Sequence, residues 1–248
     1  MTQPFRDLEA LAKSLEKDLQ KGHRILSVFD LDSTLFDVSP RIQKILDELQ
    51  THPELTSRFP ELLPLLKGVK TLRSDWGIKS AIQRTLQHQI PPLEFQKEAR
   101  DFWSRLFFTN EYLHFDTLIE GSNEFVHSLH QMGSEIAYLT GRDWPRMGTG
   151  TVEVLKKWCF PIPGENQKTH LEMKPEKGGE DALFKSNWFR GVKTQNYHRI
   201  LFFENEPVIL HEVTKDHPEI EVVFVDTTHS GRAEPHEKWM TITDFKRK

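Results

Sequence analysis

The stretch Val28-Phe29-Asp30-Leu31-Asp32-Ser33-Thr34-Leu35 decides the fold of this 248-residue chain. It completes a short apolar segment and then places two carboxylates, those of Asp30 and Asp32, directly after it. Two carboxylates in a partly desolvated place repel each other unless a cation lies between them. Magnesium prefers such hard oxygen ligands. The stretch therefore predicts a buried strand whose carboxyl end carries a metal site.

Four further segments share this short, apolar character. Such segments are typical of parallel strands that helices cover on both faces. The predicted strands are 24–30, 135–140, 169–174, 199–204 and 219–226. Helical patterns lie between them, from Ser122 to the stop at Gly133, over 151–158, over 181–189 and from Pro207 to about Pro218. The alternation predicts an α/β fold, a Rossmann-like parallel sheet flanked by helices.

Residues 38–118 interrupt this alternation, because they contain no convincing strand pattern. Helical patterns begin there at Ser39-Pro40, at Asp75 and at Pro92. The segment is too long for a loop inside a compact domain. We therefore expect two domains: an α/β core formed by residues 1–37 and 119–248, and an inserted helical domain formed by residues 38–118.

The composition excludes several classes of partner. The chain has 37 acidic and 33 basic residues, a formal net charge of −4, and no long basic run. This argues against binding to nucleic acid or to an anionic membrane surface. No apolar run of about 18 residues is present, so no membrane span is expected.

The N-terminus and the cysteine content point to the cytoplasm. Phe5, Leu8, Leu11, Leu15 and Leu19 recur at helical spacing among charged residues, which indicates an amphipathic helix and not a secretory signal. Cys159 is the only cysteine, so an intramolecular disulfide is impossible. Its apolar neighbours predict a buried structural thiol.

Four segments, in chain order, resemble the motifs of the haloacid dehalogenase superfamily. Residues 30–34 are similar to its first motif, D-x-D-x-[TS], and Thr140 stands where the family has a Thr or Ser at the end of the next core strand. The third motif is a lysine, for which both Lys174 and Lys185 are candidates. We favour Lys185, which lies 19 residues before Glu204. The resemblance covers nearly the whole chain and implies that residues 38–118 form a C1-type cap.

The fourth motif departs from the usual family pattern, in which an Asp is common. This chain has Glu204-Asn205-Glu206 after the fourth strand. Glu204 and Asn205 still supply a carboxylate and a neutral oxygen ligand, although less negative charge implies weaker binding of Mg2+. Glu206 could compensate for this, or it could simply favour the dipole of the helix that follows.

The resemblance implies a Mg2+-dependent phosphatase that acts on a small phosphorylated substrate. Asp30 would be the nucleophile, forming an aspartyl-phosphate, and Asp32 the general acid and base. The implied metal ligands are the Asp30 carboxylate, the Asp32 backbone carbonyl, Glu204 and Asn205. The implied phosphate-binding residues are Thr140, Gly141, Arg142 and either Lys185 or Lys174.

Weaker candidates and other functions stay open at this point. Substrate contacts are possible for His229 and Arg232 in the loop after the fifth strand, and for Arg73, Trp76 and Lys79 in the insertion. A phosphomutase has the same motifs, and a non-catalytic module that binds phosphorylated ligands is a further alternative. A polynucleotide end phosphatase is disfavoured by the acidic balance. The substrate and the oligomeric state are left undetermined.

Overall fold

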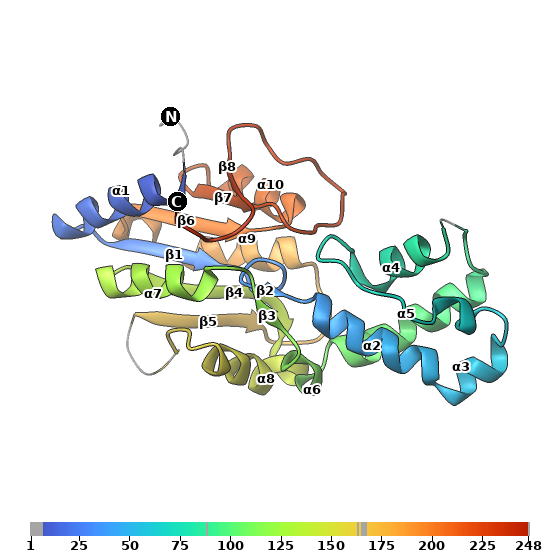
Figure 1. The fold of residues 1–248 in the computed structure, drawn as a ribbon. Helices are drawn as coiled ribbons and strands as arrows, with labels where there is room; N and C mark the ends of the chain where they lie inside the picture. Colours follow the sequence, from blue (N-terminus) through green and yellow to red (C-terminus); the bar gives the residue numbers. More distant parts are fainter. Residues whose placement is uncertain (1–6, 88, 163, 165–167, 248) are drawn as a thin grey trace.

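The structure is a computed structural model that describes residues 7–87, 89–162, 164 and 168–247 (Figure 1). Its centre is a six-stranded sheet in the order β5-β4-β1-β6-β7-β8, and every neighbouring pair is parallel. The strands are β1 (Ile25–Phe29), β4 (Glu135–Asp143), β5 (Thr169–Lys174), β6 (Arg199–Glu204), β7 (Glu221–Val225) and β8 (Met240–Ile242). The predicted α/β fold with a Rossmann-like parallel sheet is therefore confirmed.

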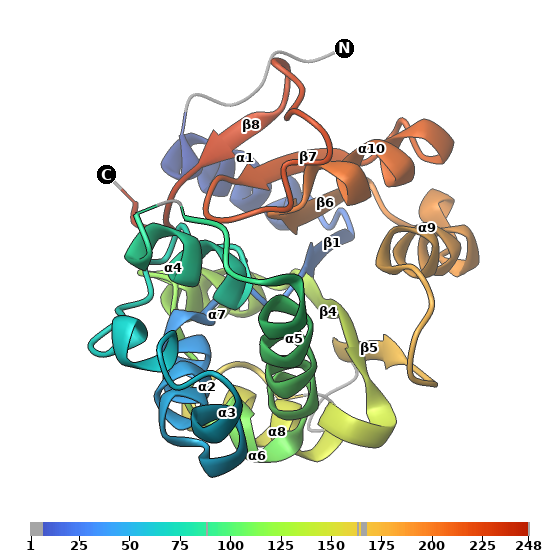
Figure 2. The ribbon, with the colours of Figure 1, turned by 90° about the vertical axis from the view of Figure 1, so that its right-hand side faces the viewer.

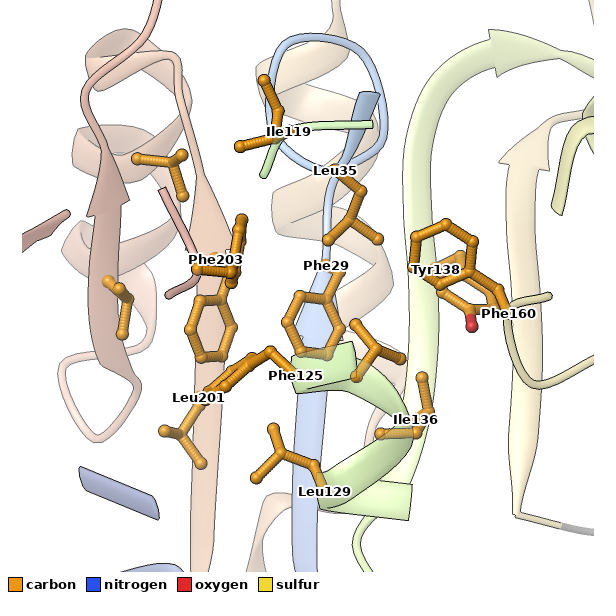
Figure 3. Close-up of a cluster of buried hydrophobic side chains, with 14 of the residues drawn as sticks. Phe29, Leu35, Ile119, Phe125, Leu129, Ile136, Tyr138, Phe160, Leu201 and Phe203 are labelled. Carbon is orange, nitrogen blue, oxygen red and sulfur yellow. The ribbon is translucent and has the colours of Figure 1, made fainter. Parts of the chain in front are cut away.

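Helices cover both faces of the sheet, and β1 contributes to an apolar core on each side. Ile25 and Phe29 belong to the core under α1 (Leu8–Gln20), α7 (Ser122–Met132) and α8 (Trp144–Lys157) (Figure 3). Leu26 and Val28 belong to the core under α9 (Asp181–Gly191) and α10 (Pro207–Asp216). This alternation follows from the two-residue period of a strand and explains why β1, apart from Ser27, is apolar throughout.

The helical interval of the sequence forms a layer beyond the carboxyl ends of the strands (Figures 1 and 2). It has a separate apolar cluster that includes Ile45, Leu49 and Phe95. Its elements are α2 (Ser39–Thr51), α3 (Pro53–Arg58), the 3-10 turn η1 (Leu63–Leu66), α4 (Gly77–Thr85), α5 (Leu93–Phe107) and α6 (Asn110–Leu113). The short antiparallel pair of β2 (Phe36–Asp37) and β3 (Thr117–Leu118) connects the two ends of this layer to the sheet.

Several expectations were wrong in detail. α8 starts at Trp144 and not at Thr151, because the side chain of Asp143 accepts a hydrogen bond from the Arg146 amide and caps the helix. Gly148 and Gly150 weaken the helical pattern there. Gly150 is nevertheless required, since a Cβ atom on it would lie 2.7 Å from a backbone oxygen of α6.

Cys159, predicted to be buried, is exposed. It has a φ of 55° and follows the C-terminus of α8, where the chain turns and carries the side chain outward. Of the predicted N-terminal helix, Phe5 lies outside the described residues. Within the described parts of the chain, no helix has the length and apolarity that crossing a membrane would require.

Candidate active site

The loop after β1 turns sharply and leaves Asp30 at the carboxyl edge of the sheet. The amides of Leu35 and Phe36 both donate to the carbonyl of Leu31, and Ser33 adopts a left-handed φ of 63°. The Asp30 amide donates to the Phe203 carbonyl of neighbouring β6 at 3.0 Å. The Asp30 side chain is therefore buried at the junction of β1 and β6.

Lys185 lies between the carboxylates that end these two strands. Its Nζ is 2.5 Å from Oδ1 of Asp30 and 2.7 Å from Oε2 of Glu204, and all three side chains are buried. Burial would lower the pKa of Lys185, but the two carboxylates outweigh it and raise that pKa above its usual value. Lys174 does not join this group. Its Nζ pairs with Oδ1 of Asp181 at 2.7 Å.

One lysine cannot neutralise both carboxylates. Burial, together with the charge of Asp30, raises the pKa of Glu204 to about 8. Burial also raises the pKa of Asp30, against the opposing effect of Lys185. A further cation beside this pair would stabilise the ionised forms of both acids.

Backbone and side-chain hydrogen bonds fix the turn after β6. Oε1 of Glu204 accepts from the amides of Asn205 and Glu206. Asn205 accepts at Oδ1 from the Thr34 hydroxyl at 3.1 Å and donates to the Thr228 carbonyl. The structure therefore brings the amide of Asn205 to the loop that carries Asp30.

The carboxylate of Glu206 points toward the loop after β7. It accepts from the amide of Ser230 at 2.9 Å and from its hydroxyl at 2.7 Å. This contact holds the loop that contains Arg232. The sequence leaves metal compensation and a favourable effect on the helix dipole open for Glu206, and the observed partners add a role in positioning this loop.

Thr140 and Gly141 lie at the end of β4, on the other side of β1. The Thr140 hydroxyl accepts from the amide of Arg142 at 3.3 Å, and Thr140 is almost completely buried. A Cβ atom on Gly141 would lie 2.4 Å from the carboxylate of Asp181. A larger residue at this position would therefore have to displace the Asp181 side chain and disturb its ion pair with Lys174.

Two buried arginines bind Asp32, and one of them was not predicted. Arg142 is 2.6 Å from Oδ1 of Asp32 and 2.9 Å from Oδ2 of Asp116. Arg41, in the first turn of α2, is 2.5 Å from Oδ1 of Asp32 and 2.8 Å from Oδ1 of Asp116. Arg41 also donates to the carbonyl of Phe107 at 3.1 Å. We call Asp32, Arg41, Asp116 and Arg142 the arginine–aspartate network.

The network sets the charge state of its two acids. Burial would raise the pKa of Asp32, but Arg142 and Arg41 outweigh it and hold that pKa well below its usual range. Burial raises the pKa of Asp116 to about 6, despite the same two arginines. Asp32 is therefore ionised throughout the neutral pH range.

Sequence reasoning missed Arg41 and Asp116. A signal for Arg41 existed, since it lies within the apolar stripe of α2, four residues before Ile45, on the buried face of the helix. A charged residue there has to find a buried partner. No comparable signal marks Asp116, which stands between α6 and β3.

Most of these residues line one cavity of about 440 Å3, whereas Arg41 and Asp116 are outside its lining and contact the lining residues Asp32 and Arg142. Its lining includes Asp30, Asp32, Thr140, Gly141, Arg142, Lys185, Glu204, Asn205 and Glu206 from the sheet side. Among the weaker candidates, Trp76 and Arg232 also line it. Arg73 instead donates to the Thr243 carbonyl, Lys79 lines a neighbouring groove, and the His229 ring accepts from the Gly231 amide.

The donor set of this cavity suits a divalent cation. The sheet side of its lining brings together the carboxyl groups of Asp30, Asp32 and Glu204 and the carboxamide of Asn205. Asp30 and Glu204 share a single ammonium group, that of Lys185. Carboxylate oxygens with an adjacent carboxamide oxygen are the ligands that Mg2+ prefers.

Comparison with known proteins agrees with this geometry. Residues 26–156, just over half of the chain, match the haloacid dehalogenase-like hydrolase family. No curated protein matches the chain. The fold resembles the crystal structure of a candidate phosphatase from Clostridium difficile, with 15% identity, 89% of this chain and 94% of that chain covered, and a TM-score of 0.54. It also resembles the crystal structure of a candidate haloacid dehalogenase-like hydrolase from Burkholderia xenovorans. The sequence identity is 13%, 90% of this chain and 94% of that chain are covered, and the TM-score is 0.50.

The two solved structures support the fold, and the family match includes the strand and loop that carry Asp30 together with the end of β4. We conclude that this chain belongs to the haloacid dehalogenase-like hydrolase family.

Proposed function

We propose that the protein is a Mg2+-dependent phosphatase that hydrolyses a phosphate monoester through an aspartyl-phosphate on Asp30. The observation that carries this proposal is the position of Lys185 between Asp30 and Glu204. A buried ammonium group beside a nucleophilic carboxylate offsets the charge of an incoming phosphoryl group. Within the family, Lys185 would thus supply the third motif.

In this proposal Asp30 attacks phosphorus, the P–O bond to the alcohol breaks, and the alcohol leaves with a proton. Water then attacks the aspartyl-phosphate and releases inorganic phosphate. The hydroxyl of Thr140, which accepts from the Arg142 amide, lies on the β4 side of the same cavity, where it can donate to a phosphoryl oxygen. Arg142 is engaged by two carboxylates, so its main role here is to position Asp32.

Asp32 is proposed as the general acid and base, although its neighbouring charges favour the base role over the acid role. Arg41 and Arg142 stabilise the ionised form, which is the form that accepts a proton from the attacking water. The acid role requires Asp32 to gain a proton against these two charges. The arrangement therefore favours the second half of the reaction.

Bound Mg2+ would supply Lewis-acid stabilisation of the phosphoryl charge. The residues that would hold it are Asp30, Glu204, Asn205 and the backbone carbonyl of Asp32. We further propose that residues 38–118 act as a cap domain on a core formed by residues 1–37 and 119–248. A cap over the carboxyl edge of the sheet favours a small phosphorylated substrate, because closure excludes bulk water.

The test is turnover of para-nitrophenyl phosphate. Wild-type protein should hydrolyse it with Mg2+, lose activity with EDTA and regain it when Mg2+ is restored. Asp30→Asn should reduce kcat by at least about 1000-fold, because the carboxamide is a poor nucleophile. Full activity of a folded Asp30→Asn variant, verified by circular dichroism, would reject Asp30 as the nucleophile.

The phosphomutase alternative differs only in the acceptor of the phosphoryl group. Product analysis with hexose phosphates distinguishes the two, since a phosphatase releases one inorganic phosphate for each ester consumed. Isomerised sugar phosphate without free phosphate would favour the mutase. A folded protein without turnover of any phosphate ester would favour the binding module.

A further inference from the structure

The active-site cavity has two chemically different walls. The wall from the sheet is charged, whereas the wall from the helical segment is mainly apolar and includes Ile42, Trp76, Trp103 and Phe107. The one acid among the described residues of this second wall, Asp75, is paired with Arg84 at 2.6 Å. Trp103 packs against Phe107 with their ring centroids 4.7 Å apart. A phosphoryl group placed at the charged wall would therefore direct the rest of its molecule toward aromatic side chains.

A second cavity borders this wall. It has a volume of about 480 Å3, lies between α4 and α5, and shares Trp76, Gly77 and Trp103 with the active-site cavity. The two cavities meet at the two tryptophans. We call the second cavity the α4–α5 groove. Its inner surface includes the buried side chains of Ile78, Ile82 and Phe95, so a ligand in it would contact mostly apolar atoms.

Positive charge surrounds the α4–α5 groove. Lys79, Lys97 and Arg100 line it, and none of its described lining residues is acidic. Among the described residues, neither Lys79 nor Lys97 has a carboxylate within 4.0 Å, and Arg100 contacts only its chain neighbour Asp101, at 3.6 Å. In a protein with a net charge of −4, a groove of this kind favours an anionic ligand.

We propose that the substrate is a phosphate monoester of an elongated, aromatic or apolar alcohol that carries a second anionic group. The phosphoryl group lies at Asp30, the body of the alcohol passes Trp76 and Trp103, and the distal anion lies near Lys79 and Lys97. The proposal rests on the proposed phosphatase function. A short, polar alcohol would leave the α4–α5 groove empty and the indole of Trp76, which is 48% exposed, uncovered.

Three aryl phosphates test the proposal: phenyl phosphate, 4-biphenylyl phosphate and 4′-carboxy-4-biphenylyl phosphate. All three release a phenol, so the leaving group changes little in reactivity while its length and charge change. We expect kcat/KM to rise about tenfold from phenyl to biphenylyl phosphate, which is typical of added apolar contact. A further rise of about fivefold is expected from the distal carboxylate, at low salt.

Two variants locate the effect. Trp76→Ala should lower the ratio of kcat/KM for biphenylyl to phenyl phosphate about tenfold. Trp144→Ala is the matched control, because Trp144 is similarly exposed at 56% and lines neither cavity. Lys97→Gln should remove most of the advantage of the carboxylate. Lys67→Gln, an exposed lysine of the same helical segment outside both cavities, should not.

The outcomes separate this proposal from the one before it. Hydrolysis of phenyl phosphate without preference for the longer esters would overturn the substrate class and leave the phosphatase intact. If Trp76→Ala preferred the longer esters as strongly as the wild type does, the substrate class would also be overturned, because the α4–α5 groove would not bind the alcohol. No turnover of any of the three esters by folded, Mg2+-supplied protein would overturn the phosphatase proposal itself.

Discussion

At the scale of single residues, Arg41 has an unusual position. It belongs to the helical segment by sequence, but its guanidinium is fully buried against Asp32 of the core loop. It also pairs with Asp116, which lies where the chain returns to the sheet. One side chain thus joins both ends of the helical segment to the candidate acid and base.

Replacing Arg41 tests this position. Arg41→Met keeps the volume but leaves Asp32 and Asp116 with Arg142 alone. We expect the free energy of unfolding to fall by about 3 kcal/mol, as for a broken buried ion pair. We expect kcat to fall about 100-fold, because the general acid and base loses its position. Urea denaturation and steady-state kinetics would measure the two losses.

Arg41→Lys separates position from simple charge. A single ammonium group cannot reach both carboxylates and the Phe107 carbonyl as the guanidinium does, so most of the kcat loss should persist. KM should change less than kcat in both variants. A kcat of Arg41→Met equal to that of the wild type would show that Asp32 does not depend on this contact.

The raised pKa of Glu204 predicts that the affinity for Mg2+ depends on pH. Because its pKa is raised to about 8, Glu204 binds a proton at pH 7 that Mg2+ has to displace. Affinity for Mg2+ should therefore rise as pH increases from 6.5 to 8, by about tenfold per unit, and level off above that. Titration calorimetry in two buffers of different ionisation enthalpy should detect about one proton released per Mg2+ at pH 7.

The control for this prediction is Glu204→Gln, which has no proton to release at this position. It should bind Mg2+ more weakly and with little dependence on pH in this range. Proton release that is absent at pH 7 in the wild type would mean that Glu204 is already ionised, and that Lys185 alone compensates its charge.

At the scale of elements, the strands that the sequence revealed are those buried on both faces. β1, β4 and β6 give apolar runs that need no partner to be recognised. β8 was missed because it has three residues, Met240–Ile242, and only Met240 is buried. An edge strand of this length depends on its pairing with β7, which the local sequence does not encode.

Gly121 is a point where one element constrains another. It begins α7 with a φ of 78°, and a Cβ atom on it would lie 2.8 Å from the carbonyl carbon of Phe245. Phe245 also donates its amide to the Glu120 carbonyl, so the C-terminal segment is held against the start of this helix. Neither backbone can move without losing this contact.

Gly121→Ala should therefore lower the free energy of unfolding by about 3 kcal/mol, since backbone strain and a steric clash act together. Gly133→Ala is the control. Its φ of 105° is also unfavourable, but its nearest neighbour is the flexible Lys168 Nζ at 3.9 Å, so about 1 kcal/mol is expected. If urea denaturation showed that both variants lose the same free energy of unfolding, the close contact with Phe245 would not destabilise Gly121→Ala.

At the scale of the whole molecule, the candidate site combines residues of two kinds. Asp30, Thr140, Glu204 and Asn205 were predictable because parallel strands bring their carboxyl ends to one edge. Lys185 was favoured over Lys174 from its spacing alone, and the structure brings only Lys185 to Asp30. Arg41 and Asp116 were not found, because their place depends on how the helical layer packs on the sheet.

The charge of the assembled site predicts the order in which ligands bind. Asp30, Asp32 and Glu204 line the place proposed for the phosphoryl group, and each of them repels a phosphate dianion when it is ionised, until Mg2+ is present. Vanadate or phosphate alone should therefore not change the Tm of the protein. With saturating Mg2+, vanadate at 100 times its Kd should stabilise the protein by about 2.7 kcal/mol, or raise the Tm by roughly 5–10 °C.

Thermal unfolding with each ligand singly and with both measures this coupling directly. By linkage, vanadate must tighten Mg2+ binding by the same factor by which Mg2+ tightens vanadate binding. Above pH 8, where Glu204 is ionised, Glu204→Gln removes one negative charge, so vanadate without metal should bind this variant better than it binds the wild type. A Tm that rises equally with vanadate alone and with vanadate plus Mg2+ would mean that Lys185 and Arg142 are sufficient for the anion, and that the site does not require the metal.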